Sequence, residues 1–270
     1  MSDEEKQMES ALDLMRRMPP SQTEQNLTFI LELVPELTDD LLQTIDQPLK
    51  VDKCPKTGKK YLLCDYNRDA DSHRSPHSNE YNPSIEDGAL PSDKLRKMEI
   101  AANAIFDVYR ELYFAGGVSS VYFWDLETGF ACAVLIQKDV NASRGVEKGS
   151  WNSIHVVEVE EKSSSQAHYQ LTSTIMLSCL AKTNKMDLAG TLTKQAELDT
   201  KVSKRLTHVV NIGKIVQDME NTLRAQMNAI YFGKTQQITS NLRKTMSRDD
   251  RDAQNAMTDE LNKKFTGEDA

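Results

Sequence analysis

Residues 118–138 read VSSVYFWDLETGFACAVLIQK, in which two runs of β-branched, aromatic and small apolar side chains flank the turn residues Glu127, Thr128 and Gly129. Runs of this composition, bounded by a turn that contains Gly, predict two β-strands. The connection is too short to hold a crossover helix, so the two strands must pair antiparallel.

Three further strands are expected after this hairpin, again with short turns between them. Residues 167–180, AHYQLTSTIMLSCL, alternate most clearly, with Tyr169, Leu171 and Ile175 on one face. No helical period interrupts the series, which predicts an antiparallel meander. Its strands are expected at Val118–Asp125, Phe130–Lys138, Trp151–Glu161, Ala167–Leu180 and Leu188–Thr193.

Helices are expected on both sides of the meander. Before it, Ser92 is a candidate N-cap and Gly116-Gly117 a terminator of a helix. The apolar stripe of that helix is Leu95, Met98, Ala102, Ile105, Tyr109 and Leu112. After the meander, the helical period returns from about Asp199 to Lys244 and predicts a long helix across one sheet face. Its stripe is Leu206, Val209, Ile212, Val216, Met219, Leu223, Met227 and Ile230.

The chain before residue 92 is divided into smaller elements. Prolines separate residues 1–50 into three short helices, expected to form a small bundle or layer. The second helix opens with a capping-box pattern at Ser21–Glu24. Tyr61–Tyr66 is a candidate strand, and residues 67–91, rich in Asn, Asp, Ser and Pro, predict an irregular loop.

Composition excludes several classes of protein. The 270 residues carry 33 basic and 41 acidic side chains, a formal net charge of −8, which disfavours a nucleic-acid partner. The start of the chain lacks the apolar core of a secretory signal, and the longest apolar run, Phe130–Ile136, is too short to cross a bilayer. We therefore expect a cytoplasmic protein with reduced cysteines at Cys54, Cys64, Cys132 and Cys179.

Two groups of residues imitate metal sites without completing them. Residues 65–71 begin like an EF-hand loop, but Ala70 stands where the turn needs Gly and Pro76 where a bidentate Glu is needed. A zinc set would lack the usual short Cys pair, since its members would be Cys54, Cys64, His73 and His77. We expect no metal and no other cofactor.

Catalytic signatures are also incomplete. Gly233–Thr235 resembles the end of a P-loop, yet Asn228 occupies the position of the first Gly. Gly117–Val121 lacks the second Gly of a nucleophile elbow. An enzyme is therefore a weak hypothesis, and no catalytic residue is expected.

The last part of the chain separates a basic stretch from an amphipathic segment. Residues 234–244 contain Lys234, Arg243 and Lys244 and no acidic residue, which suits either a helix C-terminus or a contact surface. The segment beyond Ser247 places its apolar side chains at a spacing of four, and it could dock on its own domain or in a partner's groove. Those side chains are Ala253, Met257, Leu261 and Phe265.

Long strings of the sequence resemble the beta subunit of the F-actin capping protein, from about Ala11 to Arg243. The strings are Asp46–Lys50, Tyr61–Asp69, Glu86–Ala89, Leu95–Lys97, Gly116–Tyr122, Trp124–Leu126, Ser153–Val159, His168–Leu177, Asn211–Gly213 and Ile230–Thr235. The resemblance implies an α+β chain that forms an obligate heterodimer with an alpha subunit. The dimer would bind actin filament barbed ends without calcium and block subunit addition and loss.

The resemblance also implies an organisation in five segments. Residues 1–50 would be an N-terminal helical stalk, 51–116 a linking strand, loop and helix, 117–195 an antiparallel sheet continued into the partner's sheet, 196–245 the long helix, and 246–270 a mobile amphipathic segment called the tentacle. Actin contacts would fall on Lys234, Arg243, Lys244, Met257, Leu261 and Phe265.

Further partners follow from the family alone. Its members interact with twinfilin, myotrophin, capping-protein-interaction motif proteins and phosphoinositides, and the same assembly occurs in the dynactin complex. The expected location is the cytoplasm, at the cytoskeleton. The alternative function is a scaffold subunit of a larger cytoskeletal assembly that does not cap filaments.

Overall fold

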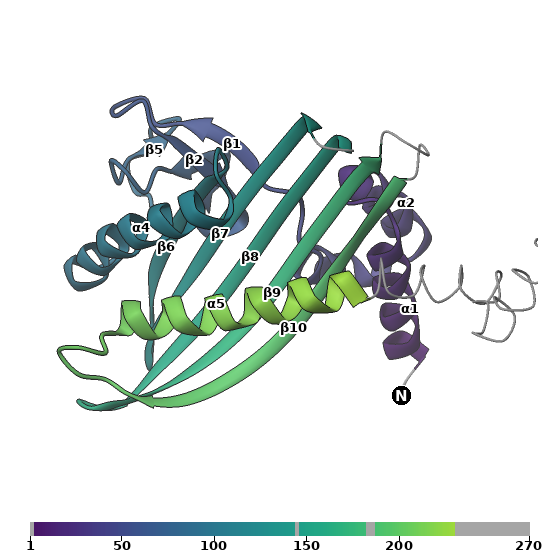
Figure 1. Cartoon of the computed structure of the whole chain (residues 1–270). Coiled ribbons are helices and arrows are strands. Elements are labelled where there is room, and N and C mark those ends of the chain that lie inside the picture. Colours follow the sequence, from purple (N-terminus) through teal and green to yellow (C-terminus); the bar gives the residue numbers. More distant parts are fainter. Residues whose placement is uncertain (1–2, 144–145, 182–186, 230–270) are drawn as a thin grey trace, which may run out of the picture. The chain divides into compact units, whose positions relative to one another are not determined.

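The structure is a computed structural model that describes residues 3–143, 146–181 and 187–229. Within this part, helices and two small sheets pack around a five-stranded antiparallel sheet (Figure 1). Residues 1–223 form one compact unit and residues 224–270 a second, of which only residues 224–229 are described.

The central sheet is the expected meander of five strands. Its spatial order is β10-β9-β8-β7-β6, and every neighbouring pair is antiparallel. This confirms the α+β fold class and the order of strands, although several strands are longer than expected. The strands are β6 (Val118–Leu126), β7 (Gly129–Ser143), β8 (Val146–Ser163), β9 (Gln166–Ala181) and β10 (Asp187–Lys201).

The two faces of the sheet are covered by different layers. On one face, Leu49 and Leu62 pack in a buried cluster with Tyr122, Leu135 and Ile154 of the sheet. Figure 1 shows α5 (His208–Met227) crossing the strands on the other face. The residues of α5 that this contact buries are Val209, Ile212, Ile215, Val216, Met219 and Leu223.

The N-terminal helices form their own small core. They are α1 (Asp3–Arg17), α2 (Thr23–Leu33) and α3 (Thr38–Thr44), as expected. Their buried cluster is Ala11, Met15, Leu27, Ile30, Leu37 and Leu41. The expected capping box is wrong, because Ser21 lies inside the 3-10 turn Pro20–Gln22, and the Thr23 hydroxyl donates to the Pro20 carbonyl at 2.8 Å.

Residues 50–91 are more ordered than the sequence suggested. β1 (Lys50–Lys53) pairs with β2 (Lys60–Leu63), and a second small sheet joins β3 (Arg68–Asp69), β4 (Ser72–Arg74) and β5 (Tyr81–Asn82). The loop expected at 67–91 is therefore partly wrong. The buried Asn67 amide donates to the Arg74 carbonyl at 2.9 Å, and its carbonyl accepts the Cys64 N–H at 2.9 Å. Side-chain hydrogen bonds thus hold a segment that shows no apolar period.

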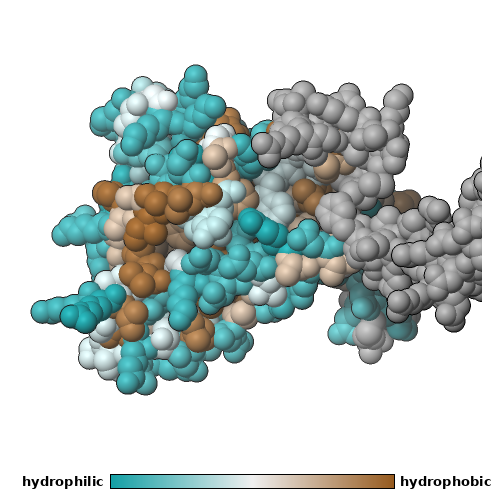
Figure 2. Space-filling view, viewed as in Figure 1, coloured by the Kyte–Doolittle hydropathy of each residue, from teal (hydrophilic) through white to brown (hydrophobic). Residues whose placement is uncertain are grey.

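Helix α4 (Asp93–Tyr113) lies near its expected position, but its buried face only partly coincides with the expected stripe. Its buried residues are Leu95, Glu99, Ala102 and Phe106. Ile105 and Leu112, expected inside, are 45% and 73% exposed, and with Val108 they leave the hydrophobic patch seen over α4 in Figure 2. The expected stripe is thus confirmed at Leu95 and Ala102 and wrong at Ile105 and Leu112, because Glu99 and Phe106 complete the inner face instead.

Both ends of α4 lie where they were expected, since Ser92 is the N-cap residue and the helix ends before Gly116, but the cap differs in its contacts. Ser92 makes no side-chain cap, since its hydroxyl and its backbone N–H both donate to the Asp125 carboxylate at 2.9 Å. Gly116 has φ +78, a conformation that glycine adopts without a steric penalty, so the chain can turn there from α4 into β6.

The Glu99 carboxylate is fully buried and binds groups from three elements. Arg74 of β4 donates to its two oxygens at 2.8 and 2.7 Å, and Arg96 of α4 donates to it as well. The backbone N–H of Phe123 in β6 donates to it at 2.8 Å. A charge removed from water in this way is tolerated because its lone pairs are all engaged by cations or N–H groups.

Helix α5 begins later than its periodicity suggested. The helix was expected from about Asp199, but β10 continues to Lys201 and pairs with β9 up to Gln166. Cross-strand pairing therefore overrides a segment whose composition also suits a helix. Leu206 lies before α5 and is 45% exposed, whereas the Thr207 hydroxyl accepts the Val210 N–H at 3.4 Å near the start of the helix.

Replacing Glu99 by Gln tests the buried carboxylate. The amide keeps the volume but leaves the Arg74 charge buried without a counter-charge, which should lower the free energy of unfolding by roughly 3–5 kcal/mol. Glu111→Gln is the matched control, because it removes an exposed partner of Arg110 and should cost less than about 1 kcal/mol. Urea unfolding of the chain purified together with the alpha subunit that the resemblance implies, followed by circular dichroism, measures both variants. Equal losses would contradict the role given to Glu99.

Candidate subunit interface

The residues that the resemblance assigns to actin lie outside the described residues. They are Lys234, Arg243, Lys244, Met257, Leu261 and Phe265, and the P-loop-like Gly233–Thr235 lies there as well. The described part instead presents the two edges of the sheet. An edge strand exposes backbone N–H and C=O groups that a second chain can use.

The outer edge of β6 is closed by side chains of α4. Asn103 binds Val121 like a neighbouring strand, because its carbonyl accepts the Val121 N–H at 3.0 Å and its amide donates to the Val121 carbonyl at 2.8 Å. Glu99 accepts the next outward N–H, that of Phe123. A chain that approached β6 here would have to displace these bonds.

The outer edge of β10 has its outward N–H groups on odd-numbered residues. The N–H groups of successive residues in a strand point to opposite sides, and the pairing between strands relates their directions. The outward N–H of Val121 therefore tells which N–H groups of β10 point outward. Val121 pairs with Val134, Val134 with His155, His155 with Ser173 and Ser173 with Lys194. From these pairs it follows that the Lys194 N–H points inward, to β9. The N–H groups of β10 that point away from the sheet are therefore those of Thr191, Thr193, Gln195 and Glu197.

The edge of β10 is open within the described part of the chain. No described residue hydrogen-bonds to these outward groups. On the α5 side of the sheet, β10 presents Leu192, Ala196 and the 38% exposed Leu198. On the other side, Thr191 and Thr193 line a small cavity with Leu12 and Met15 of α1. A strand added to β10 would therefore meet apolar side chains on one face and the N-terminal helices on the other.

Helix α5 is fixed to the sheet by buried polar contacts. His155 of β8 is hydrogen-bonded through Nε2 to Glu220 at 3.0 Å and through Nδ1 to the Ser173 hydroxyl at 2.8 Å. Asn211 donates to the Tyr169 hydroxyl and to the Lys201 carbonyl, both at 3.1 Å. Such directional bonds set the position of α5 on the sheet more narrowly than apolar packing can.

The start of α5 is also tied to α4 through β8. Glu161 lies 2.8 Å from the Lys94 amine and 3.1 Å from His208 Nε2. The hydrogen bond from Lys94 lowers the pKa of the Glu161 carboxyl, and partial burial lowers the pKa of His208. The two helices on this side are thus held at a fixed separation from the same strand.

The groups that imitate metal sites do not assemble in the described residues. Cys54 lies 3.4 Å from the Ser78 hydroxyl, and His77 is hydrogen-bonded to the Lys60 carbonyl, so the two side chains have other partners. Among residues 3–143, 146–181 and 187–229, no group of three His, Cys, Asp or Glu side chains could hold a metal ion. All four cysteines are free thiols.

In this chain, α4 closes one edge of the meander and the other edge is open within the described residues. This arrangement is typical of a subunit whose sheet is completed by another chain. Comparison with known proteins identifies the family. The chain belongs to the F-actin capping protein beta subunit family, whose model matches residues 8–239. This confirms the resemblance inferred from the sequence.

Individual relatives match over nearly the whole chain. An F-actin-capping protein subunit beta of Drosophila melanogaster is 54% identical over 95% of this chain and 94% of its own length. The F-actin-capping protein subunit beta of Caenorhabditis elegans is 53% identical over 96% of this chain and 96% of its own length. That of Dictyostelium discoideum is 53% identical over 88% of this chain and 90% of its own length.

The fold also resembles that of a solved structure. A homodimeric actin capping protein alpha subunit from Plasmodium berghei matches with a TM-score of 0.54 and 15% identity, covering 90% of this chain and 97% of that one. At this identity the likeness concerns the fold alone.

No helix in the described residues is both long and apolar enough to cross a membrane.

The residues that cover the outer edge of β6 were not predicted from the sequence. Glu99 and Asn103 lie four residues apart on α4, a spacing that places them on one helix face and could have signalled a polar contact. Arg74 lies in the segment expected to be a loop. Only the sheet register shows which backbone groups these side chains satisfy.

A proline at position 195 tests the open edge of β10. Gln195→Pro removes an outward N–H while keeping the inward ladder, a change that edge strands tolerate. A partner carbonyl left without its donor should cost about 1–3 kcal/mol, which is roughly a five- to hundredfold weaker association. Gln195→Val is the control, because it loses the side-chain bond to Thr172 but keeps the N–H.

The measurement is the amount of heterodimer recovered when each variant is co-expressed with a tagged capping protein alpha subunit. The proline variant should yield much less complex than the valine variant. Equal recovery would show that no partner strand pairs at this part of β10.

Proposed function

We propose that this chain is the beta subunit of a heterodimeric capping protein that binds the barbed end of actin filaments and blocks subunit addition and loss. The observation that carries the proposal is the match to beta subunits over nearly the whole chain. The proposed action requires no calcium, cofactor or catalytic step, and its place is the cytoplasmic actin cytoskeleton.

The alpha subunit is proposed to bind along β10. The open edge supports this, because strand addition there would satisfy backbone groups that have no hydrogen-bond partner in the described part of the chain. The partner's sheet would continue the meander, and its side chains would cover Leu192 and Leu198. Helix α5, fixed by His155 and Asn211, would then lie on a sheet shared by two chains.

Actin contact is proposed for two groups in the C-terminal sequence. Lys234, Arg243 and Lys244 form a basic stretch on an otherwise acidic chain, and Met257, Leu261 and Phe265 share one face of an amphipathic segment. The first group would guide association, and the second would add a separate contact. Twinfilin, myotrophin, capping-protein-interaction motif proteins, phosphoinositides and dynactin are proposed as further partners on the resemblance alone.

Filament elongation in the presence of the alpha subunit tests the proposed function. The co-expressed pair should stop growth at barbed ends, and the chain expressed alone should aggregate because an obligate subunit has no stable free form. A stable complex that leaves elongation unchanged would favour the non-capping scaffold. A monodisperse, cooperatively melting lone chain would argue against an obligate heterodimer.

Reversing the basic stretch should slow capping. Exposed charges act mainly on diffusional encounter, so Lys234→Glu with Arg243→Glu and Lys244→Glu should reduce the association rate by about tenfold or more. The dissociation rate should change less, and added salt should reproduce part of the effect on the unmodified dimer. Single-filament association rates measure this, and rates insensitive to both changes would remove the basic stretch from the mechanism.

Removing the amphipathic segment should mainly affect release. Burial of three apolar side chains on actin would contribute about 5–9 kcal/mol to the free energy of binding. Ordering a short helix opposes a large part of this contribution. Deleting residues 247–270 should therefore raise the dissociation rate from barbed ends and leave heterodimer assembly intact. Leu261→Asp should reproduce much of the loss, whereas release as slow as that of the full-length dimer would exclude the segment as a binding element.

A further inference from the structure

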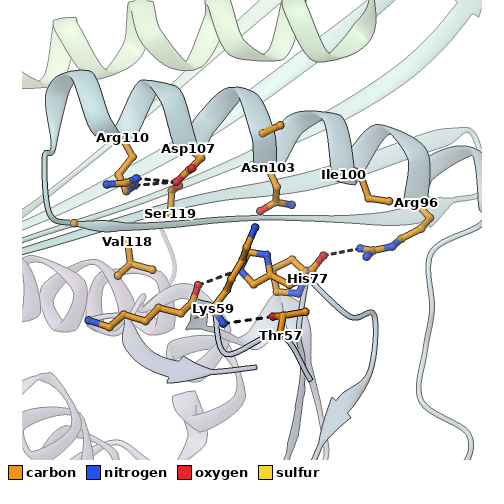
Figure 3. A pocket seen from close by; sticks show the side chains of 14 residues that line it. Thr57, Lys59, His77, Arg96, Ile100, Asn103, Asp107, Arg110, Val118 and Ser119 are labelled. Carbon is orange, nitrogen blue, oxygen red and sulfur yellow. Dashed lines mark hydrogen bonds and ion pairs between the residues drawn. The ribbon is translucent and has the colours of Figure 1, made fainter. Parts of the chain in front are cut away.

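A groove of about 550 Å³ lies between α4 and the turn that joins β1 to β2. Figure 3 shows Arg96, Asn103 and Arg110 pointing from α4 into this groove and Lys59 reaching toward them from the hairpin. Val118, at the start of β6, forms part of the lining. The groove therefore has one helical wall and one hairpin wall.

The groove is cationic on a chain whose net charge is −8. Its Lys and Arg residues are Lys59, Lys60, Arg96 and Arg110, and Asp107 is the one acidic residue of the lining. Arg96 binds Glu99 and the Pro76 carbonyl, and Arg110 binds Asp107 and Glu111. Lys59 and Lys60 are exposed and form no ion pair with any described residue, so their charges are available to a ligand.

The groove is elongated, with an apolar centre. Arg96 and Arg110 are 14 residues apart on α4, which corresponds to about 21 Å along the helix axis. Between them, Ile100 is 54% exposed and Ala104 lines the same wall. Cations spread over this length do not converge on one point, as binding a compact polyanion would require.

We propose that this groove binds an extended acidic segment of a partner protein, with one apolar side chain seated on Ile100. A strand-like segment advances about 3.3 Å per residue, so about six residues span the groove. Its carboxylates would meet the exposed Lys59 and Lys60, whereas the paired Arg96 and Arg110 side chains mark the two ends of the helical wall. Charge complementarity selects the acidic segment, and Ile100 sets where its apolar residue lies.

This site is separate from the proposed subunit interface. The groove lies at the β6 side of the sheet, and β10 is the strand at the opposite edge. The backbone of β6 is already covered by Asn103 and Glu99, so the ligand is held by side chains rather than by strand addition. An acidic partner could therefore bind while β10 is occupied.

The probe is a fluorescein-labelled heptapeptide, Asp-Glu-Asp-Leu-Asp-Glu-Asp, titrated by fluorescence anisotropy with the full-length chain purified together with its alpha subunit. A second peptide carries Ser in place of Leu. Lys59→Glu with Lys60→Glu should weaken binding of the first peptide by about tenfold or more, because two attractive contacts become repulsive. Lys204→Glu with Lys214→Glu reverses two exposed charges elsewhere and should change binding less than about twofold.

The apolar contact has its own test. Ile100→Ser should weaken the Leu peptide several-fold and leave the Ser peptide unchanged, since burying an apolar side chain contributes only where both partners are apolar. Thermal unfolding of each variant should match the unmodified complex, because Lys59, Lys60 and Ile100 are exposed.

Three results would overturn the proposal. Equal losses in the two charge-reversal variants would mean that the peptide senses only the general field of the protein. No difference between the Leu and Ser peptides would remove the role of Ile100. Inositol hexakisphosphate binding more tightly than the Leu peptide, with dependence on Lys59 and Lys60, would mean that the groove selects a compact polyanion.

Discussion

The Glu99 carboxylate is the contact on which the arrangement of the sheet depends. It is buried, it accepts hydrogen bonds from Arg74 and Arg96, and it also accepts the Phe123 N–H at the outer edge of β6. A carboxylate is acceptor-only, so it can take the place of a neighbouring strand's carbonyl for that N–H. Asn103, one helical turn further along α4, does the same for both backbone groups of Val121. These two side chains close the outer edge of β6 at Val121 and Phe123.

Closing one edge decides how the chain can assemble. A sheet with two open edges could add chains at both sides, whereas a sheet with one open edge can add a chain at that edge only. The structural neighbour, a capping protein alpha subunit, has a related fold at a TM-score of 0.54. A partner with a related fold could offer one edge of its own to β10, and the pair would then have no free strand left at its centre. The polar contacts that fix α5 place this helix on the surface that such a pair would share.

The sequence predicted the elements that depend on apolar periodicity and missed those held by polar side chains. The meander, the three N-terminal helices and the approximate bounds of α4 follow from spacing alone. The inner face of α4 does not, because Glu99 looks like a solvent residue until Arg74 and Arg96 are seen around it. The small sheet at 68–82 rests on the Asn67 amide, and the length of β10 on its pairing with β9. Which strand edge is open could not be predicted, since it depends on Asn103 and Glu99 of α4 covering the backbone of β6.

The placement of charge separates the surfaces that the chain can offer. The buried Arg74 and the partly buried Arg96 share the Glu99 carboxylate, and Arg110 is paired with the exposed Asp107 and Glu111, so all three cations already have partners. Lys59 and Lys60 have no such partner among the described residues, so their charges contribute to a positive potential at the groove. The same helix, α4, therefore serves two purposes through different faces. Its inner face seals β6 with Glu99 and Asn103, and its adjacent face, from Arg96 through Ile100 to Arg110, lines a groove whose free charge favours an acidic chain.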